Sequence, residues 1–137
     1  MDKQYYPVEI EEKWSKIWSE KVLSNKDSDT SFSQVIPPPN VTGTLHMGHS
    51  FQYAIMDFYT RYHHMSGKDA HWQVGADHAG IATQMVVENN LAKKDVTRKE
   101  LGREKFLEEV WSWKDYSEEK ITSQIKRLGC SVDWNKY

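Results

Sequence analysis

The chain has 137 residues, of which 38% are hydrophobic, 12% aromatic and 28% charged, and its 18 basic and 20 acidic side chains give a formal net charge of −2. A net charge so close to zero provides no overall attraction to nucleic acid. The sequence has no run of roughly 18 apolar residues that could span a membrane and no apolar signal-peptide core at its start. The single cysteine, Cys130, cannot form a disulfide framework. We therefore expect a soluble cytoplasmic protein with no membrane partner.

Charge is distributed unevenly along the chain. All six histidines lie in a charge-poor middle stretch, and both flanks are rich in charged side chains. We therefore expect the functional site in the middle of the chain. The mean hydropathy of −0.79 is polar for a domain that folds alone, which leaves open that the chain is part of a larger protein. The only charged residues between positions 37 and 86 are Asp57, Arg61, Lys68, Asp69 and Asp77.

The first elements follow from the spacing of apolar side chains. Apolar residues at helical spacing, with charges between them, predict an amphipathic helix over about residues 7–22, and a polar loop follows at 24–31. Residues 32–36 alternate and end in β-branched side chains, which predicts a short strand stopped by the prolines at 37–39. A second helix is expected from about Leu45 to Tyr62. Its apolar positions are 47, 51, 54, 55, 58, 59 and 62.

The next elements repeat this order. Residues 66–68 end the helix, residues 70–74 are predicted as a second strand, and a turn at 75–80 leads into a helix over about 81–93. Two strands joined by a helical crossover of this length favour a right-handed unit with parallel strands. In such sheets a ligand binds beyond the carboxyl ends of the strands.

The last third is helical and highly charged. Thr97 followed by Glu100 predicts a capping box at the start of a helix over about 98–115. A second helix is predicted over 117–128, with Gly129 as its terminator. The predicted fold class is therefore α/β, with helices at both ends of the chain.

The segment richest in chemistry is His46-Met47-Gly48-His49. If the helix begins near Leu45, His46 and His49 project from the same side of its first turn, beside free backbone N–H groups and the positive end of the helix dipole. That arrangement attracts a phosphate. Gly48 removes a side chain where a flat base or a ribose would approach the helix backbone.

An isolated His-x-x-His pair is more often a surface feature or half of a metal site than a phosphate site. A metal is disfavoured because Cys130 is distant in the sequence and no carboxylate completes a close set, although Asp77 and His78 could contribute in space. We predict no tightly bound metal. The other histidines and four tryptophans are interpreted as structural residues of helices and strands, namely His63, His64, His71, Trp14, Trp18, Trp111 and Trp113.

A second strand-loop-helix junction spans residues 72–84. Asp77 comes at its strand end and could hold a cationic group such as an α-ammonium, or could serve as a helix N-cap. Asn40, in the first junction, could likewise be a plain turn residue. Two such junctions side by side would form one pocket.

These two segments resemble class I aminoacyl-tRNA synthetases and, within that class, the valyl-tRNA synthetase family. Residues 37–49 read Pro-Pro-Pro-Asn-Val-Thr-Gly-Thr-Leu-His-Met-Gly-His, and residues 75–84 read Gly-Ala-Asp-His-Ala-Gly-Ile-Ala-Thr-Gln. The opening Tyr-x-Pro, Leu-Gly-Arg-Glu-Lys-Phe at 101–106 and Leu-Gly-x-Ser-Val-Asp-Trp at 128–134 continue the match. The resemblance covers nearly the whole chain.

The resemblance implies a fold and a domain organisation. It identifies the chain with the first part of a Rossmann-like catalytic domain, with parallel strands and flanking helices. Residues 1–31 would form an amino-terminal helix and polar loop, and residues 32–137 an incomplete first half of the nucleotide-binding domain. The family's second ATP signature, its editing domain and its anticodon-binding helices find no counterpart in this sequence. We therefore expect an amino-terminal piece that is not fully active alone.

The resemblance also implies roles for individual residues. His46, Gly48 and His49 would bind ATP, and the two histidines would be catalytic because they stabilise charge that develops on the phosphates. Pro38, Asn40 and Asp77 would position the amino acid, with Asp77 facing its ammonium group.

The implied reaction joins valine and ATP, which carries Mg²⁺, into valyl-adenylate, and then transfers valine to tRNA(Val). The family binds that tRNA through regions mostly missing from this sequence, and its full-length members are expected to be monomers. The alternative is a stand-alone nucleotide-binding module or a nucleotidyltransferase, because a His-x-Gly-His site also occurs in such enzymes.

Overall fold

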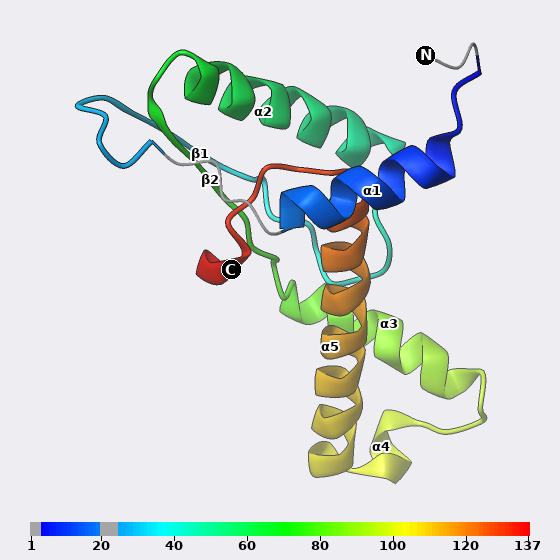
Figure 1. Ribbon diagram of the computed structural model, residues 1–137. Coiled ribbons are helices and arrows are strands. Elements are labelled where there is room, and N and C mark those ends of the chain that lie inside the picture. The colour runs from blue at the N-terminus through cyan, green and yellow to red at the C-terminus, as the bar shows by residue number, and fades with distance from the viewer. Residues whose placement is uncertain (1–3, 20–24) are drawn as a thin grey trace. The chain divides into compact units, whose positions relative to one another are not determined.

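A computed structural model describes residues 4–19 and 25–137 of the chain. This part of the chain is α/β, as predicted, with two strands, five α-helices and a short terminal 3-10 helix (Figure 1). It divides into two compact units. The first unit comprises the described residues of Met1–Pro37, His46–Gly75 and Ser123–Tyr137, and the second comprises Pro38–Leu45 and Ala76–Thr122.

The first unit contains a parallel pair of strands with a helix on it. β1 (Ser31–Val35) and β2 (Asp69–Gln73) pair in register from Ser31 opposite Asp69 to Val35 opposite Gln73, which confirms the predicted parallel arrangement. The Ile36 N–H extends the ladder by donating to the Gln73 carbonyl at 2.9 Å. α2 (Met47–Met65) packs on both strands (Figure 1). α1 (Pro7–Ser19) confirms the start of the first predicted helix, and positions 20–22 of that prediction lie outside the described residues.

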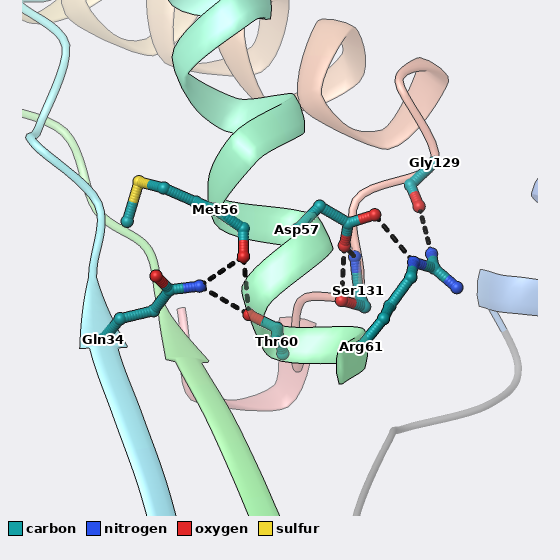
Figure 2. A network of polar contacts seen from close by, with 7 residues as sticks. All are labelled: Gln34, Met56, Asp57, Thr60, Arg61, Gly129 and Ser131. Carbon is teal, nitrogen blue, oxygen red and sulfur yellow. Dashed lines mark hydrogen bonds and ion pairs between the residues drawn. The ribbon is translucent and has the colours of Figure 1, made fainter. Parts of the chain in front are cut away.

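α2 buries its polar side and exposes most of its apolar positions. Its buried residues are Tyr53 and Thr60. The Gln34 amide on β1 donates to the Met56 carbonyl and to the Thr60 hydroxyl, both at 2.5 Å, so hydrogen bonds tie this side of the helix to the sheet (Figure 2). The spacing of the apolar residues therefore predicted the helix correctly. The side of the helix that is buried is not the side that carries those apolar residues. The large apolar side chains that α2 exposes are Met47, Phe51, Ile55, Phe58, Tyr59, Tyr62 and Met65.

A polar network ties the middle of α2 to the turn after the last long helix (Figure 2). Asp57 accepts from the Ser131 N–H at 2.7 Å and from the Ser131 hydroxyl, and its other oxygen accepts from Arg61 Nε at 2.7 Å. Arg61 Nη2 donates to the Gly129 carbonyl at 2.8 Å, and its guanidinium lies 4.7 Å from the centre of the Trp18 ring on α1. Three chain segments of the first unit thus meet at the Asp57–Arg61 pair.

The second unit is built mainly from helices. α3 (Gly80–Ala92) and α5 (Arg103–Arg127) contribute its core residues Val87, Leu91 and Phe106. Between them lies the one-turn helix α4 (Arg98–Leu101), and the predicted capping box of Thr97 and Glu100 at its start is confirmed. None of the helices in the described residues is long and apolar enough to cross a membrane.

The predicted break between two carboxyl-terminal helices is wrong in its position. The break falls at Gly102, whose φ of +78° suits glycine and separates α4 from α5. α5 then runs without interruption through Ser117, which is buried and lies on the same side of the helix as Phe106 and Ile121. Ser117 resembles an N-cap in the sequence, but a buried apolar stripe continues through it. Gly129, with a φ of +73°, follows the end of α5 as predicted.

The Asp57 network generates a stability prediction. Asp57→Ala should lower the free energy of unfolding by about 2–3 kcal/mol, because hydrogen bonds to a charged group are lost and Arg61 and Ser131 lose their partner. Ser131→Ala removes only the hydroxyl contact and should cost about 1 kcal/mol. Urea denaturation measures both. Asp115→Ala is the control, since this exposed carboxylate should contribute less than about 0.5 kcal/mol to the free energy of unfolding. An equal loss of that free energy in Asp57→Ala and Asp115→Ala would contradict the prediction.

Candidate functional site

Two histidines cap the start of α2 reciprocally. α2 begins at Met47, two residues later than predicted, and His46 is its N-cap. His46 Nδ1 accepts from the Gly48 N–H at 3.1 Å, and His49 Nδ1 accepts from the His46 N–H at 3.2 Å. The two imidazole rings lie side by side, with centroids 4.0 Å apart and planes at 39°. The prediction that the pair shares one side of the helix start is confirmed.

The caps correct one part of the prediction. The backbone N–H groups of His46 and Gly48 are not free, because the imidazoles already accept from them. An imidazole that accepts at Nδ1 is neutral and carries its proton on Nε2. The helix start therefore presents two neutral Nε2–H donors beside the positive end of the α2 dipole. Donors of this kind suit a phosphate group.

The electrostatics of His49 favour the neutral ring. Partial burial lowers the pKa of His49 below its ordinary value, and the neighbouring His46 lowers it further. Both causes act against a positive charge on this imidazole. Because a neutral ring is needed for the Nδ1 cap, the pKa shift and the hydrogen bond support the same tautomer.

Gly48 gives His46 the room to form its cap. A Cβ at position 48 would lie 2.9 Å from His46 Cε1, closer than real Cβ atoms come to another atom, and 3.0 Å from His46 Nδ1. The sequence indicated Gly48 as a place for a ligand to approach. The structure adds that the His46 ring itself occupies the space beside this glycine.

The second set of site residues lies in the second unit, on two loops that backbone hydrogen bonds hold together. Asp77 N–H donates to the Pro39 carbonyl at 2.9 Å, and Val41 N–H donates to the Asp77 carbonyl at 3.0 Å. These bonds form a parallel bridge between Asn40 and Asp77. The structure thus brings together Pro38, Asn40 and Asp77, which are 39 positions apart at most. All three are exposed.

The Asp77 side chain shapes its own loop. Its Oδ1 accepts from the Ala79 N–H at 2.9 Å. Asp77 is not the N-cap of α3, because that position belongs to Ala79, whose left-handed φ of +41° sets the turn and whose side chain forms no cap. The second carboxylate oxygen lies on an exposed side chain and can accept from an ammonium group.

Neighbouring side chains support these two loops. The Trp113 indole on α5 donates to the Val41 carbonyl at 3.1 Å, and the Thr83 hydroxyl on α3 donates to the His78 carbonyl at 2.6 Å. Trp113 therefore has the structural role that the sequence indicated. Trp111 differs from that expectation, because it is exposed and meets the His78 ring edge-on at a centroid distance of 6.2 Å.

Sequence reasoning missed one residue beside the histidine pair. The Tyr53 ring lies 5.9 Å from the His49 ring, one helical turn further along α2, and is fully buried. The signal that could have found it is the i, i+4 spacing from His49. Tyr53 is absent from the predicted apolar stripe because it faces the opposite side of the helix. Among the described residues, no three histidine, cysteine or carboxylate side chains are grouped closely enough to hold a metal ion.

Comparisons with known proteins agree with these features. The family model of class I tRNA synthetases (I, L, M and V) matches residues 9–137. The valine–tRNA ligase of Acinetobacter baylyi is 56% identical over 133 residues, which are 96% of this chain and 14% of that protein. The valine–tRNA ligase of Neisseria meningitidis serogroup B is 55% identical over 136 residues, and that of Francisella tularensis is 50% identical over 139 residues. The chain spans 14–15% of the length of these curated relatives.

The reciprocal cap should depend on pH. Because the folded-state pKa of His49 lies below its ordinary value of about 6.5, the cap's contribution to stability is present above pH 6.5 and is lost as the pH falls through the folded-state value. We expect the His46 amide resonance to move in this range when Nδ1 of His49 takes a proton. The control is the Thr97 amide, which donates to the Glu100 carboxylate at 2.9 Å and should stay bonded, since hydrogen bonds from Thr97 lower the pKa of Glu100. A His49 midpoint at or above the ordinary value would contradict the prediction.

Gly48→Ala should displace the His46 ring without unfolding the protein. The added methyl group collides with the imidazole, while alanine itself favours helix over glycine by roughly 1 kcal/mol. We expect the Gly48 amide cap to be lost and the stability to change by less than about 1 kcal/mol, as measured by amide exchange and urea denaturation. Gly80→Ala is the control, because position 80 also begins a helix and has open space around it. If the amides at the helix starts were equally protected from exchange in Gly48→Ala and Gly80→Ala, the displacement of the His46 ring would be refuted.

Proposed function

Since the chain belongs to the class I tRNA synthetase family (I, L, M and V), we propose that it supplies part of the ATP and amino acid site of a valine–tRNA ligase. The observation that carries this proposal is the reciprocal histidine cap at the start of α2, within a sequence 50–56% identical to valine–tRNA ligases. The proposed substrates are valine, ATP with its Mg²⁺, and tRNA(Val). The proposed location is the cytoplasm.

In the first proposed step, a carboxylate oxygen of valine attacks the α-phosphorus of ATP. The bond to the β-phosphate oxygen breaks, valyl-adenylate forms and pyrophosphate leaves. Negative charge builds up on the phosphate oxygens as the bond breaks. The Nε2–H donors of His46 and His49 would stabilise that charge, because they are held in place before the reaction and need no reorganisation.

In the second proposed step, a hydroxyl at the 3′ end of the tRNA attacks the carbonyl carbon of valyl-adenylate, and AMP leaves. The proposed role of Asp77 is to hold the valine ammonium group throughout. Its exposed second oxygen supports this role, since the first one is used by the Ala79 N–H. Pro38 and Asn40 belong to the same hydrogen-bonded pair of loops and would complete the amino acid site.

A nucleotidyltransferase or a plain nucleotide-binding module is not favoured. Such a protein needs the histidine pair but has no use for an exposed carboxylate on a second loop fixed to the first. The identity with valine–tRNA ligases extends over both loops and 96–99% of the chain.

Valine-dependent exchange of pyrophosphate into ATP, by the whole protein that carries this chain, tests the proposal. We expect exchange with valine and far less with isoleucine or leucine. Asp77→Asn should raise the KM for valine about 10- to 100-fold, because a charge-assisted hydrogen bond of about 1.5–3 kcal/mol is weakened. The KM for ATP should change little.

The asparagine at position 77 keeps an oxygen for the Ala79 N–H, so the loop should hold its shape. Asp115→Asn is the matched control on an exposed carboxylate outside the site. Exchange driven by isoleucine or leucine would refute the valine assignment. An unchanged KM for valine in Asp77→Asn would refute the role of Asp77.

A further inference from the structure

Four aromatic rings of the first unit lie in contact, one after another, from the sheet to the start of α2. Trp72 on β2 meets Tyr53 edge-on at a centroid distance of 6.3 Å. Tyr53 meets His49 at 5.9 Å, with planes at 44°, and His49 meets His46 at 4.0 Å. We name this set of four residues the aromatic column. The two longer spacings are typical of favourable aromatic pairs.

The aromatic column is buried at one end and accessible at the other. Tyr53 is 0% exposed and Trp72 is 1% exposed, whereas His46 is exposed. Buried aromatic rings are held by the packing around them and occupy few rotamers. The two imidazoles have less packing around them and are held by their Nδ1 hydrogen bonds. The column therefore connects an exposed hydrogen-bonded ring to a buried, closely packed one.

We propose that Tyr53 is a positioning residue for His49, and that its ring fixes the imidazole so that Nδ1 caps the helix while the Nε2–H stays available to ATP. This inference rests on the proposed function. The reason to expect an effect on the reaction is geometric, because a misplacement of about 1 Å at a site of charge stabilisation can cost about 100-fold in rate. The Tyr53 ring lies close to His49, whose partial burial lowers its pKa and favours the neutral imidazole.

The Tyr53 ring, and not its hydroxyl, carries the proposal. Within the described residues, the buried Tyr53 hydroxyl has no hydrogen-bond partner, and burial raises its pKa to about 12, so it stays protonated near neutral pH. The titratable groups that act on this part of the column are His46 and Cys130. Burial also raises the pKa of the Cys130 thiol to about 12, so it adds no charge.

Tyr53→Leu and Tyr53→Phe, in the whole protein, separate the ring from the hydroxyl. We expect Tyr53→Leu to lower kcat for valine-dependent pyrophosphate exchange about 10- to 100-fold, with less than a twofold change in the KM for valine. Tyr53→Phe should restore kcat to within about twofold of the original protein, because the ring is kept. Tyr59→Leu is the matched control, since Tyr59 lies on the same helix, is exposed and meets the Phe58 ring instead.

Nitrogen-15 NMR of His49 gives a readout that loss of fold alone does not imitate. In a folded Tyr53→Leu protein, we expect His49 to populate both neutral tautomers and its pKa to rise toward the ordinary value. In Tyr53→Phe, the Nε2–H tautomer should persist. If Tyr53→Leu does not fold, Tyr53→Met fills a similar volume without a flat ring, and the same changes are expected.

Two results would overturn the proposal. One is a folded Tyr53→Leu or Tyr53→Met protein whose kcat and His49 tautomer match those of the original protein. The other is a Tyr53→Phe protein as impaired as Tyr53→Leu. Failure of the proposed function looks different, because the original protein would then show no valine-dependent exchange. The His49 tautomer would in that case still decide whether Tyr53 positions the ring.

Discussion

The parallel pairing of β1 with β2 is the constraint on which the first unit depends. Parallel strands end at the same edge of a sheet, so the chain leaves Val35 and Gln73 in the same direction. After each strand the sequence supplies rigid or turn-forming residues, and the bonds that join Pro39, Val41 and Asp77 hold the two following loops together. Pro38, Asn40 and Asp77 are therefore brought together by backbone hydrogen bonds, before any side chain acts.

α2 adds a second constraint, because its polar side decides how it lies on the sheet. Gln34, Thr60 and Asp57 make hydrogen bonds that only one rotation of the helix satisfies. Partly buried polar groups of this kind cost free energy when they lose a partner, so they select one arrangement more sharply than apolar packing does. With that rotation fixed, Tyr53 faces the core, and His49 lies one helical turn before it on α2. The orientation of the histidine pair thus depends on contacts two to four turns away.

The sequence predicted the element order, the parallel strands, the Thr97 capping box and the position of His46 and His49 on one side of the helix start, because each depends on local pattern or on chain direction. It did not predict which side of α2 is buried, since the polar partners Gln34 and Ser131 lie far away in the sequence. The continuity of α5 through Ser117 was missed for a similar reason, because a serine's burial is decided by tertiary packing. Nor did spacing reveal that His46 and His49 cap the helix themselves, since that depends on side-chain rotamers.

Histidine at both cap positions suits the proposed contact with a phosphate. A lysine or arginine at the helix start would bring positive charge, but it has no acceptor for the backbone N–H groups of His46 and Gly48. An aspartate or serine would cap the helix, yet a carboxylate would repel a phosphate, and a serine would bring only one short donor. Neutral imidazole accepts at Nδ1 and donates at Nε2, so one side chain both completes the helix start and offers a hydrogen bond to an anion. The same property makes the cap sensitive to acid at His49, because a proton on its Nδ1 removes the hydrogen bond from the His46 N–H.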